Sequence, residues 1–193
     1  MLSKEMLSLA AIILTFVAFI PYIRSIFNQQ TKPHVFSWLI WSITTFIVFV
    51  AQLDDGAGIG AWPTGVSACV TSFVAYLAYL KKADISISKM DSLFFVAAIT
   101  SLILWYFTSS PLSAVVVLTL IDTLGFAPTF RKVYYQPYQE ERSFYALIAL
   151  RNIVAITALE NFSATTVLFP AVIAFSCSLL LVLITYRRHL LSP

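Results

Sequence analysis

The chain is poor in charged residues. Only 11% of its 193 residues are Asp, Glu, Lys or Arg, whereas an average soluble domain has about 25%. Hydrophobic residues make up 60% of the chain, and the mean hydropathy is +0.88. A water-soluble domain of this size could not cover so much apolar surface with the few polar residues available. The composition therefore excludes an ordinary soluble fold and predicts that lipid surrounds most of the molecule.

Residues that commonly carry enzyme chemistry are also scarce. The two histidines, His34 and His189, lie at the ends of predicted helices. The two cysteines, Cys69 and Cys177, lie inside apolar runs, so neither a disulfide framework nor a zinc site is predicted. We interpret both cysteines as small buried hydrophobic residues. Paired carboxylates and Gly-rich phosphate loops are lacking as well. We therefore expect no enzymatic activity, no cofactor, no metal and no nucleic-acid partner.

Long apolar runs fill most of the sequence. Crossing the hydrocarbon core of a bilayer, about 30 Å thick, takes about 20 helical residues. Seven segments meet this requirement, at residues 6–27, 35–53, 58–80, 92–108, 112–134, 143–160 and 164–186. Their continuous apolar character differs from the short alternating strands of a membrane barrel. The first segment has no A-x-A cleavage site after it, so we expect a mature helix rather than a signal peptide. The sequence predicts an all-α membrane protein with seven transmembrane helices.

The basic residues predict the orientation of these helices. Lys and Arg remain preferentially on the cytoplasmic side of a membrane. In the seven-helix arrangement ten of the twelve fall on one face: Arg24, Lys32, Lys81, Lys82, Lys89, Arg131, Lys132, Arg142, Arg187 and Arg188. Lys4 is alone on the opposite face, and Arg151 lies within a helix. We expect a protein of the plasma membrane, or of the bacterial inner membrane, with its N-terminus outside and its C-terminus in the cytoplasm.

The sequence contains an internal repeat. A shift of 107 residues places the first three helices on the last three, with Phe19, Pro21, Arg24 and Gln29 falling on Phe126, Pro128, Arg131 and Gln136. Because proline and arginine are uncommon within or beside membrane helices, chance does not readily produce these matches. We predict a three-helix repeat at residues 1–83, a linker helix within 84–111, and a second three-helix repeat at 112–193. The linker gives both copies the same orientation, and parallel repeats of this kind occur in transporters with a cavity between the copies.

This plan resembles that of a known superfamily. The segments 19–24 (FIPYIR) and 126–131 (FAPTFR), near the ends of the first and fifth helices, together with the 3+1+3 arrangement, resemble the PQ-loop or MtN3/saliva/SWEET proteins. The resemblance covers nearly the whole chain and implies a carrier of a small solute that works by alternating access. Tyr22 and Thr129 replace the glutamine of the PQ motif. The prolines and asparagine that gate and bind sugar in SWEET carriers are also missing, so a sugar substrate is not implied.

Two charged residues lie in the middle of predicted helices. Asp122 is within the fifth helix, and Arg151, followed by Asn152, is within the sixth. A charge at bilayer depth costs about 3 kcal/mol or more, so such residues face the protein interior and often mark a transport pathway. We hypothesise that Asp122 and Arg151 face the central cavity and could pair there. The 107-residue shift relates them to uncharged threonines, which include Thr44 opposite Arg151.

Three roles for this polar group remain open. Arg151 could receive an anionic group of the substrate, with Asn152, Thr44 and Thr45 completing the polar contacts. Alternatively, Asp122 could be a proton-coupling site, because a desolvated carboxylate can take up a proton. In the third role, the charges form a structural lock between helices. Trp41, one turn before Thr44, could stack on a ligand or belong to the core.

Prolines suggest where the helices could bend. Pro21 and Pro128 each remove a backbone hydrogen bond within a membrane helix. They are interpreted either as a pair of hinges or as static kinks. Gly125 adds conformational freedom in the second copy alone.

These features predict a membrane transporter that moves a small polar solute between two three-helix bundles. Its expected partners are the lipid bilayer and that solute. A monomer is sufficient, and a homo-oligomer is not excluded. The alternative is a receptor or cargo-binding protein that uses the same scaffold without translocation. A retinal protein is excluded, because no lysine follows Lys132 to form a Schiff base in the last helix.

Overall fold

The computed structural model describes residues 3–29, 33–81, 87 and 89–191. Within these residues the chain forms helices and no β-strand. Six helical segments are long and apolar enough to cross a membrane: Lys4–Phe27, Val35–Asp54, Gly58–Leu80, Lys89–Thr108, Pro111–Tyr135 and Ala164–Leu191. A further helix, Arg142–Ala158, has 17 residues. The prediction of an all-α chain with membrane-spanning helices is confirmed at this level.

The elements follow the predicted segments closely. In chain order they are α1 (Lys4–Phe27), α2 (Val35–Asp54), the 3₁₀ turn η1 (Gly58–Ala61), α3 (Trp62–Leu80), α4 (Lys89–Thr108), α5 (Pro111–Gly125), α6 (Ala127–Tyr135), the 3₁₀ turn η2 (Pro137–Gln139), α7 (Arg142–Ala158) and α8 (Ala164–Leu191). Local chemistry sets several of these boundaries. Ser3 and His34 cap α1 and α2 by accepting hydrogen bonds from the backbone N–H groups of Met6 and Ser37. Pro111 begins α5, where its missing N–H costs nothing.

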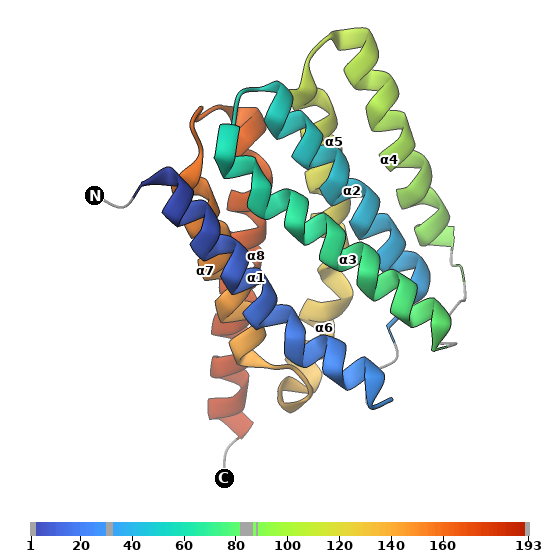
Figure 1. Cartoon of the computed structure of the whole chain (residues 1–193). Coiled ribbons are helices and arrows are strands. Elements are labelled where there is room, and N and C mark those ends of the chain that lie inside the picture. Colours follow the sequence, from blue (N-terminus) through green and yellow to red (C-terminus); the bar gives the residue numbers. More distant parts are fainter. Residues whose placement is uncertain (1–2, 30–32, 82–86, 88, 192–193) are drawn as a thin grey trace.

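The helices form a bundle whose two termini lie at opposite ends (Figure 1). We call α1, α2, η1 and α3 the first half, and α5 to α8 the second half. α1 packs against α3 and α7, α2 packs against α3 and α5, and α8 packs against α5 and α7. α4 lies at the edge of the bundle against α2 and α5, and its buried residues are Ala98 and Ser101. The two halves therefore contact each other directly.

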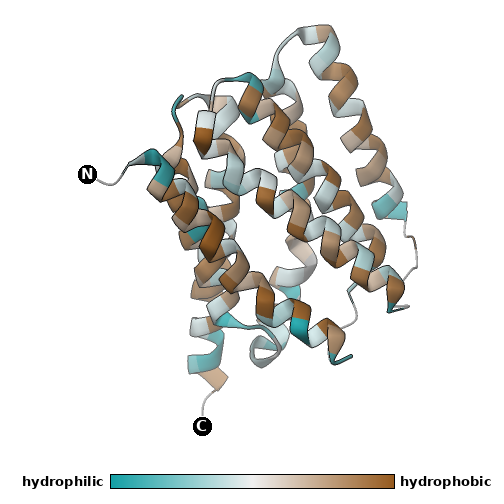
Figure 2. Cartoon of the chain, in the orientation of Figure 1, coloured by the Kyte–Doolittle hydropathy of each residue, from teal (hydrophilic) through white to brown (hydrophobic). Residues whose placement is uncertain are grey.

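The interior of the bundle is continuous across the halves. Its largest apolar cluster combines Val48 of α2, Val115 and Leu118 of α5, and Leu180 and Ile184 of α8, all fully buried. Large hydrophobic side chains also cover the outside of the helices, and apolar residues dominate the ribbon between its more polar ends (Figure 2). An apolar exterior of this extent is stable only where hydrocarbon rather than water is the solvent.

The fifth span is broken, whereas the first is not. α5 ends at Gly125, Phe126 forms a turn, and α6 begins at Ala127. The backbone N–H of Phe126 bonds to the carbonyl of Thr123, 3.1 Å away, instead of the carbonyl four residues back. α1, by contrast, continues through Pro21 without interruption. Proline alone therefore does not break these helices, and the break begins beside the glycine.

Some sequence-based expectations need correction or remain open. Cys177 is buried as expected, but the expectation for Cys69 is wrong, because its side chain is exposed on a face of α3 that α1 leaves uncovered. The predicted orientation depends partly on Lys32 and Lys82, which lie outside the described residues. The side chain of Pro128 also lies outside them, although its backbone continues α6.

The end of the bundle where α1 begins depends on a close approach between the halves. A Cβ atom added to Gly60 of η1 would lie 2.5 Å from the Cα of Leu159, which follows α7. No side chain fits there without moving the backbone.

We predict that Gly60→Val lowers the free energy of unfolding by about 1–3 kcal/mol, since an overpacked contact must shift backbone. The measurement is the melting temperature of the detergent-purified protein. Ala127→Val, which adds the same size of side chain at an exposed helical position, is the matched control. Equal melting temperatures for the two variants would contradict the close approach at Gly60.

Candidate functional site between the two halves

Buried polar side chains gather where the two halves meet. Asp122 of α5 is 6% exposed, and Arg151 and Asn152 of α7 are 4% and 1% exposed. Thr15 of α1 and Thr44 of α2 are fully buried. Each charged residue thus lies on a helix of the second half and is enclosed by helices of the first half. The prediction that the mid-helix charges face the interior agrees with these positions.

The Arg151 guanidinium joins three helices. Its Nε donates a hydrogen bond to Oγ1 of Thr15 on α1, at 3.1 Å, and its Nη1 donates to Oδ1 of Asn152 at 2.7 Å. Its Nη2 donates to the backbone carbonyl of Pro63 at the start of α3. Asn152 is held in turn by a 2.8 Å hydrogen bond from its Nδ2 to the carbonyl of Ile148. The cation is therefore fixed by neutral oxygens from both halves.

The Asp122 carboxylate makes the other polar contact between the halves. Oγ1 of Thr44 on α2 donates a hydrogen bond to Oδ1 of Asp122 at 3.0 Å. The same hydroxyl lies 3.1 Å from the carbonyl of Trp41, one turn earlier. Thr45 is also buried on α2, but it makes no hydrogen bond to Asp122 or Arg151.

Asp122 and Arg151 do not pair with each other. In the described part of the chain, no carboxylate lies within ion-pair distance of Arg151 and no cation lies within that distance of Asp122. Taking a charge out of water without an opposite charge beside it costs several kcal/mol. Both groups therefore keep an electrostatic demand that their neutral hydrogen-bond partners do not meet.

The two contacts occupy equivalent positions in the sequence. Thr15 and Asp122 are 107 residues apart, and so are Thr44 and Arg151. The bond from Arg151 to Thr15 joins α7 to α1, and the bond from Thr44 to Asp122 joins α2 to α5. Each half thus contributes one residue of each kind of position, and in both contacts the charged residue comes from the second half.

Trp41 lies against the break in the fifth span. Its ring is half-buried and packs edge-on against Trp38, with ring centroids 5.4 Å apart. A Cβ atom added to Gly125 would lie 3.1 Å from Nε1 of this indole. Trp41 is thus placed between the core and the predicted hinge. In the described structure it packs against protein, as the core interpretation expected.

Sequence reasoning missed a polar clasp that joins the halves where α1 begins. Its members are Lys4, Ser8, Gln52, Asp55, Glu160, Asn161 and Ser163. Ser8 donates to the carbonyl of Ile59 at 2.9 Å within the first half. Between the halves, Lys4 donates to the carbonyl of Leu159, and Nδ2 of Asn161 donates to the carbonyl of Asp55 at 2.7 Å.

Three further bonds complete this clasp. Ser163 Oγ donates to the Asp55 carboxylate, Glu160 Oε1 accepts from the N–H of Ile59 at 3.2 Å, and Gln52 Nε2 donates to the carbonyl of Thr166 at 2.8 Å. The available signal was the prediction that both loops lie at the same membrane face. Their pairing could not be deduced from it.

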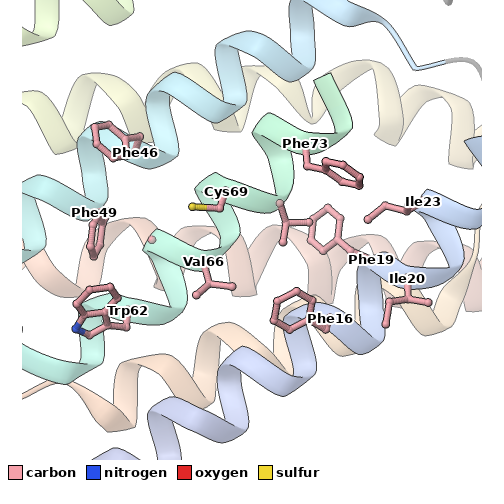
Figure 3. Close-up of a pocket in the computed structure, with 12 residues that line it drawn as sticks. Phe16, Phe19, Ile20, Ile23, Phe46, Phe49, Trp62, Val66, Cys69 and Phe73 are labelled. Carbon is pink, nitrogen blue, oxygen red and sulfur yellow. The ribbon is translucent and has the colours of Figure 1, made fainter. Parts of the chain in front are cut away.

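A pocket lies within the first half rather than between the halves (Figure 3). It has a volume of about 480 Å³ and is lined by α1, α2 and α3. We call it the aromatic groove, because Phe16, Phe19, Phe46, Phe49, Trp62 and Phe73 supply much of its wall. The cavity expected from the repeat was central, and no sequence pattern singled out this groove.

Comparison with known proteins finds no matching family model, no similar curated protein and no similar solved structure. The resemblance to PQ-loop proteins therefore rests on the sequence features given above.

We predict that Thr44→Val lowers the free energy of unfolding by about 1–3 kcal/mol, because the buried Asp122 carboxylate loses its hydrogen-bond donor. Thr45→Val removes the same group from the neighbouring buried position and should cost less. Thermal unfolding in detergent measures both. If the hydrogen bond is responsible, the Thr44→Val effect shrinks in an Asp122→Asn background. Equal losses for the two valine variants would contradict the contact.

Proposed function

We propose that this protein is a membrane carrier that moves a small polar solute along the contact between its two halves by alternating access. The first half and the second half act as the two repeats, and α4 acts as the linker. The observation that carries the proposal is the pair of equivalent buried contacts, Thr15 with Arg151 and Thr44 with Asp122, where the halves meet.

The packing of the helices supports the division into two repeats. A shift of 107 residues relates α1 to α5 and α6, α2 to α7, and α3 to α8. Under this exchange the α1–α3 packing corresponds to α5–α8, α2–α3 corresponds to α7–α8, and α1–α7 corresponds to α2–α5. All six of these pairs are in contact. Parallel repeats of this type place a substrate site near the bilayer midplane, between the copies.

The uncompensated charges support a polar substrate. Arg151 is held by neutral oxygens alone, so an anionic group of a solute would supply the opposite charge that it lacks. Asn152, Thr44 and Thr45 lie on the same helices and would provide neutral contacts. Asp122 would be the coupling site if protons drive the flux, because binding a proton removes its charge. These two roles use different residues and can be separated by experiment.

The two ends of the bundle suggest how access would alternate. The polar clasp holds the halves together where α1 begins, so it would have to open for a solute to enter from that side. Near the other end, aromatic rings of α1 and α7 meet, with Phe19 and Phe144 centroids 5.6 Å apart. The break between α5 and α6 lies on that side of the site and would allow α6 to move. With the predicted orientation, the clasp faces outside and α6 faces the cytoplasm.

The first test measures ligand binding. The detergent-purified protein and its Arg151→Gln variant are heated with sugars, amino acids, nucleosides and carboxylates. A ligand that binds only the folded state raises the melting temperature, by an amount that grows with concentration above its dissociation constant. We expect an anionic solute to stabilise the wild type and not Arg151→Gln. Arg142→Gln, at the exposed start of α7, is the control and should respond as the wild type does. Equal stabilisation of all three proteins would remove Arg151 from the site.

Flux separates a carrier from a receptor on the same scaffold. The solute that stabilises the protein is supplied in labelled form to liposomes that contain it. Uptake supports the carrier, and binding without uptake supports the receptor. An Asp122→Asn protein that transports with its full pH dependence would eliminate proton coupling at Asp122.

The break in the fifth span gives a separate prediction. Ala18 is the residue equivalent to Gly125 in the first half. Gly125→Ala should therefore make the second half resemble the continuous α1, because alanine favours helix by up to about 1 kcal/mol over glycine. We expect slower uptake with unchanged ligand affinity, measured in the same liposomes. Ala18→Gly is the reciprocal variant and should not slow uptake. Unchanged uptake by Gly125→Ala would show that the break is not a hinge.

A further inference from the structure

The aromatic groove is an unfilled feature of the first half. On α1 it is lined by Phe16, Phe19, Ile20 and Ile23, and on α3 its lining runs from Trp62 to Phe73. Figure 3 shows Trp62 near one end and Ile23 with Phe73 near the other. The 11 residues from Trp62 to Phe73 span about 16 Å of helix. That length is close to half of the hydrocarbon core, which is about 30 Å thick, so the groove matches one acyl chain of a single leaflet.

The groove is not a general consequence of the fold. Ser176, Cys177 and Leu180 of α8 are equivalent to Cys69, Val70 and Phe73 of α3, and all three are buried. In the first half, Cys69 and Phe73 are exposed instead. The open, ring-lined surface therefore belongs to the first half alone. Substitutions there can be tested against the second half of the same molecule.

Basic residues lie beyond one end of the groove. Phe27 follows Ile23 by one turn at the end of α1, and Nζ of Lys81, at the end of α3, lies 5.5 Å from the centre of the Phe27 ring. Arg24 is exposed and adjoins Ile23. A negatively charged headgroup beside Lys81 and Arg24 would continue directly into an acyl chain beside Ile23 and Phe73. Basic residues at a membrane surface attract anionic lipid, each by about 1 kcal/mol.

We propose that the aromatic groove binds an acyl chain of an anionic phospholipid, whose phosphate lies against Lys81 and Arg24. The rings supply a fixed apolar wall of larger area than single aliphatic side chains would. The two cations select the headgroup. This site is separate from Asp122 and Arg151, and it does not depend on the transport proposal.

The test uses the full chain, delipidated in detergent and supplied with phosphatidylglycerol or with phosphatidylcholine of the same chains. Cys69 is a reporter inside the groove, and its rate of reaction with a maleimide is measured. Cys69→Ser corrects for any reaction at Cys177. We expect phosphatidylglycerol to slow the labelling and to raise the melting temperature at concentrations where phosphatidylcholine does neither.

Variants separate the headgroup from the chain. Lys81→Gln with Arg24→Gln should weaken phosphatidylglycerol binding about fivefold for each charge removed. Arg131→Gln with Arg142→Gln removes two exposed charges elsewhere and should keep the preference. Cys69→Phe, which fills the groove, should abolish stabilisation by phosphatidylglycerol. Ile103→Phe, on the exposed face of α4, should not.

Three results would overturn the proposal. Equal protection of Cys69 by both lipids would make the groove ordinary lipid-facing surface. A preference for phosphatidylglycerol that survives the Lys81→Gln and Arg24→Gln changes would place the headgroup elsewhere. Protection of Cys69 without lipid, in a protein that light scattering shows to be dimeric, would assign the groove to a second copy of the chain.

Discussion

The buried guanidinium of Arg151 is the constraint on which the arrangement of the helices depends. In lipid a cation needs hydrogen-bond acceptors from the protein itself, because no water is present to supply them. Arg151 takes them from Thr15 on α1, from the Pro63 carbonyl on α3 and from Asn152 on its own helix. Sliding any of these helices by one turn would leave a charge unsatisfied. The contact thus fixes the register of the second half against the first.

Charge is divided unequally between two halves of similar construction. The second half contributes Asp122 and Arg151, and the first half contributes hydroxyl groups at the corresponding positions. The same inequality appears in the backbone, because Gly125 precedes a break in the second half where Ala18 lies in a continuous helix. The first half in turn carries the open aromatic surface. The second half therefore holds the charged groups and the break, while the first half is the more regular framework against which they are set.

The positions of the helices could be predicted well from the sequence, and the contacts between helices could not. Continuous apolar runs ended by polar joints located all the spans, because membrane thickness determines their length. Mid-helix charge identified Asp122 and Arg151 as interior residues for the same energetic reason. Their partners depended on helix rotation, which an apolar helix hardly encodes when lipid and core are equally hydrophobic. Cys69 and the aromatic groove were missed on this account, and so were the loop pairings of the polar clasp. Whether the site binds a solute stays a prediction.

The contacts between the halves have the form of an isologous interface, in which position i of one unit meets position j of the other and the reverse contact is also made. Thr15 meets Arg151, and the equivalent of Thr15 meets the residue to which Arg151 corresponds. α4 adds little to this interface, since it lies at the edge with two buried residues. A single three-helix unit could therefore assemble with a copy of itself through the same surface. Fusion through α4 would then free each side to change alone, which is how an acid and a base could arise on one side only.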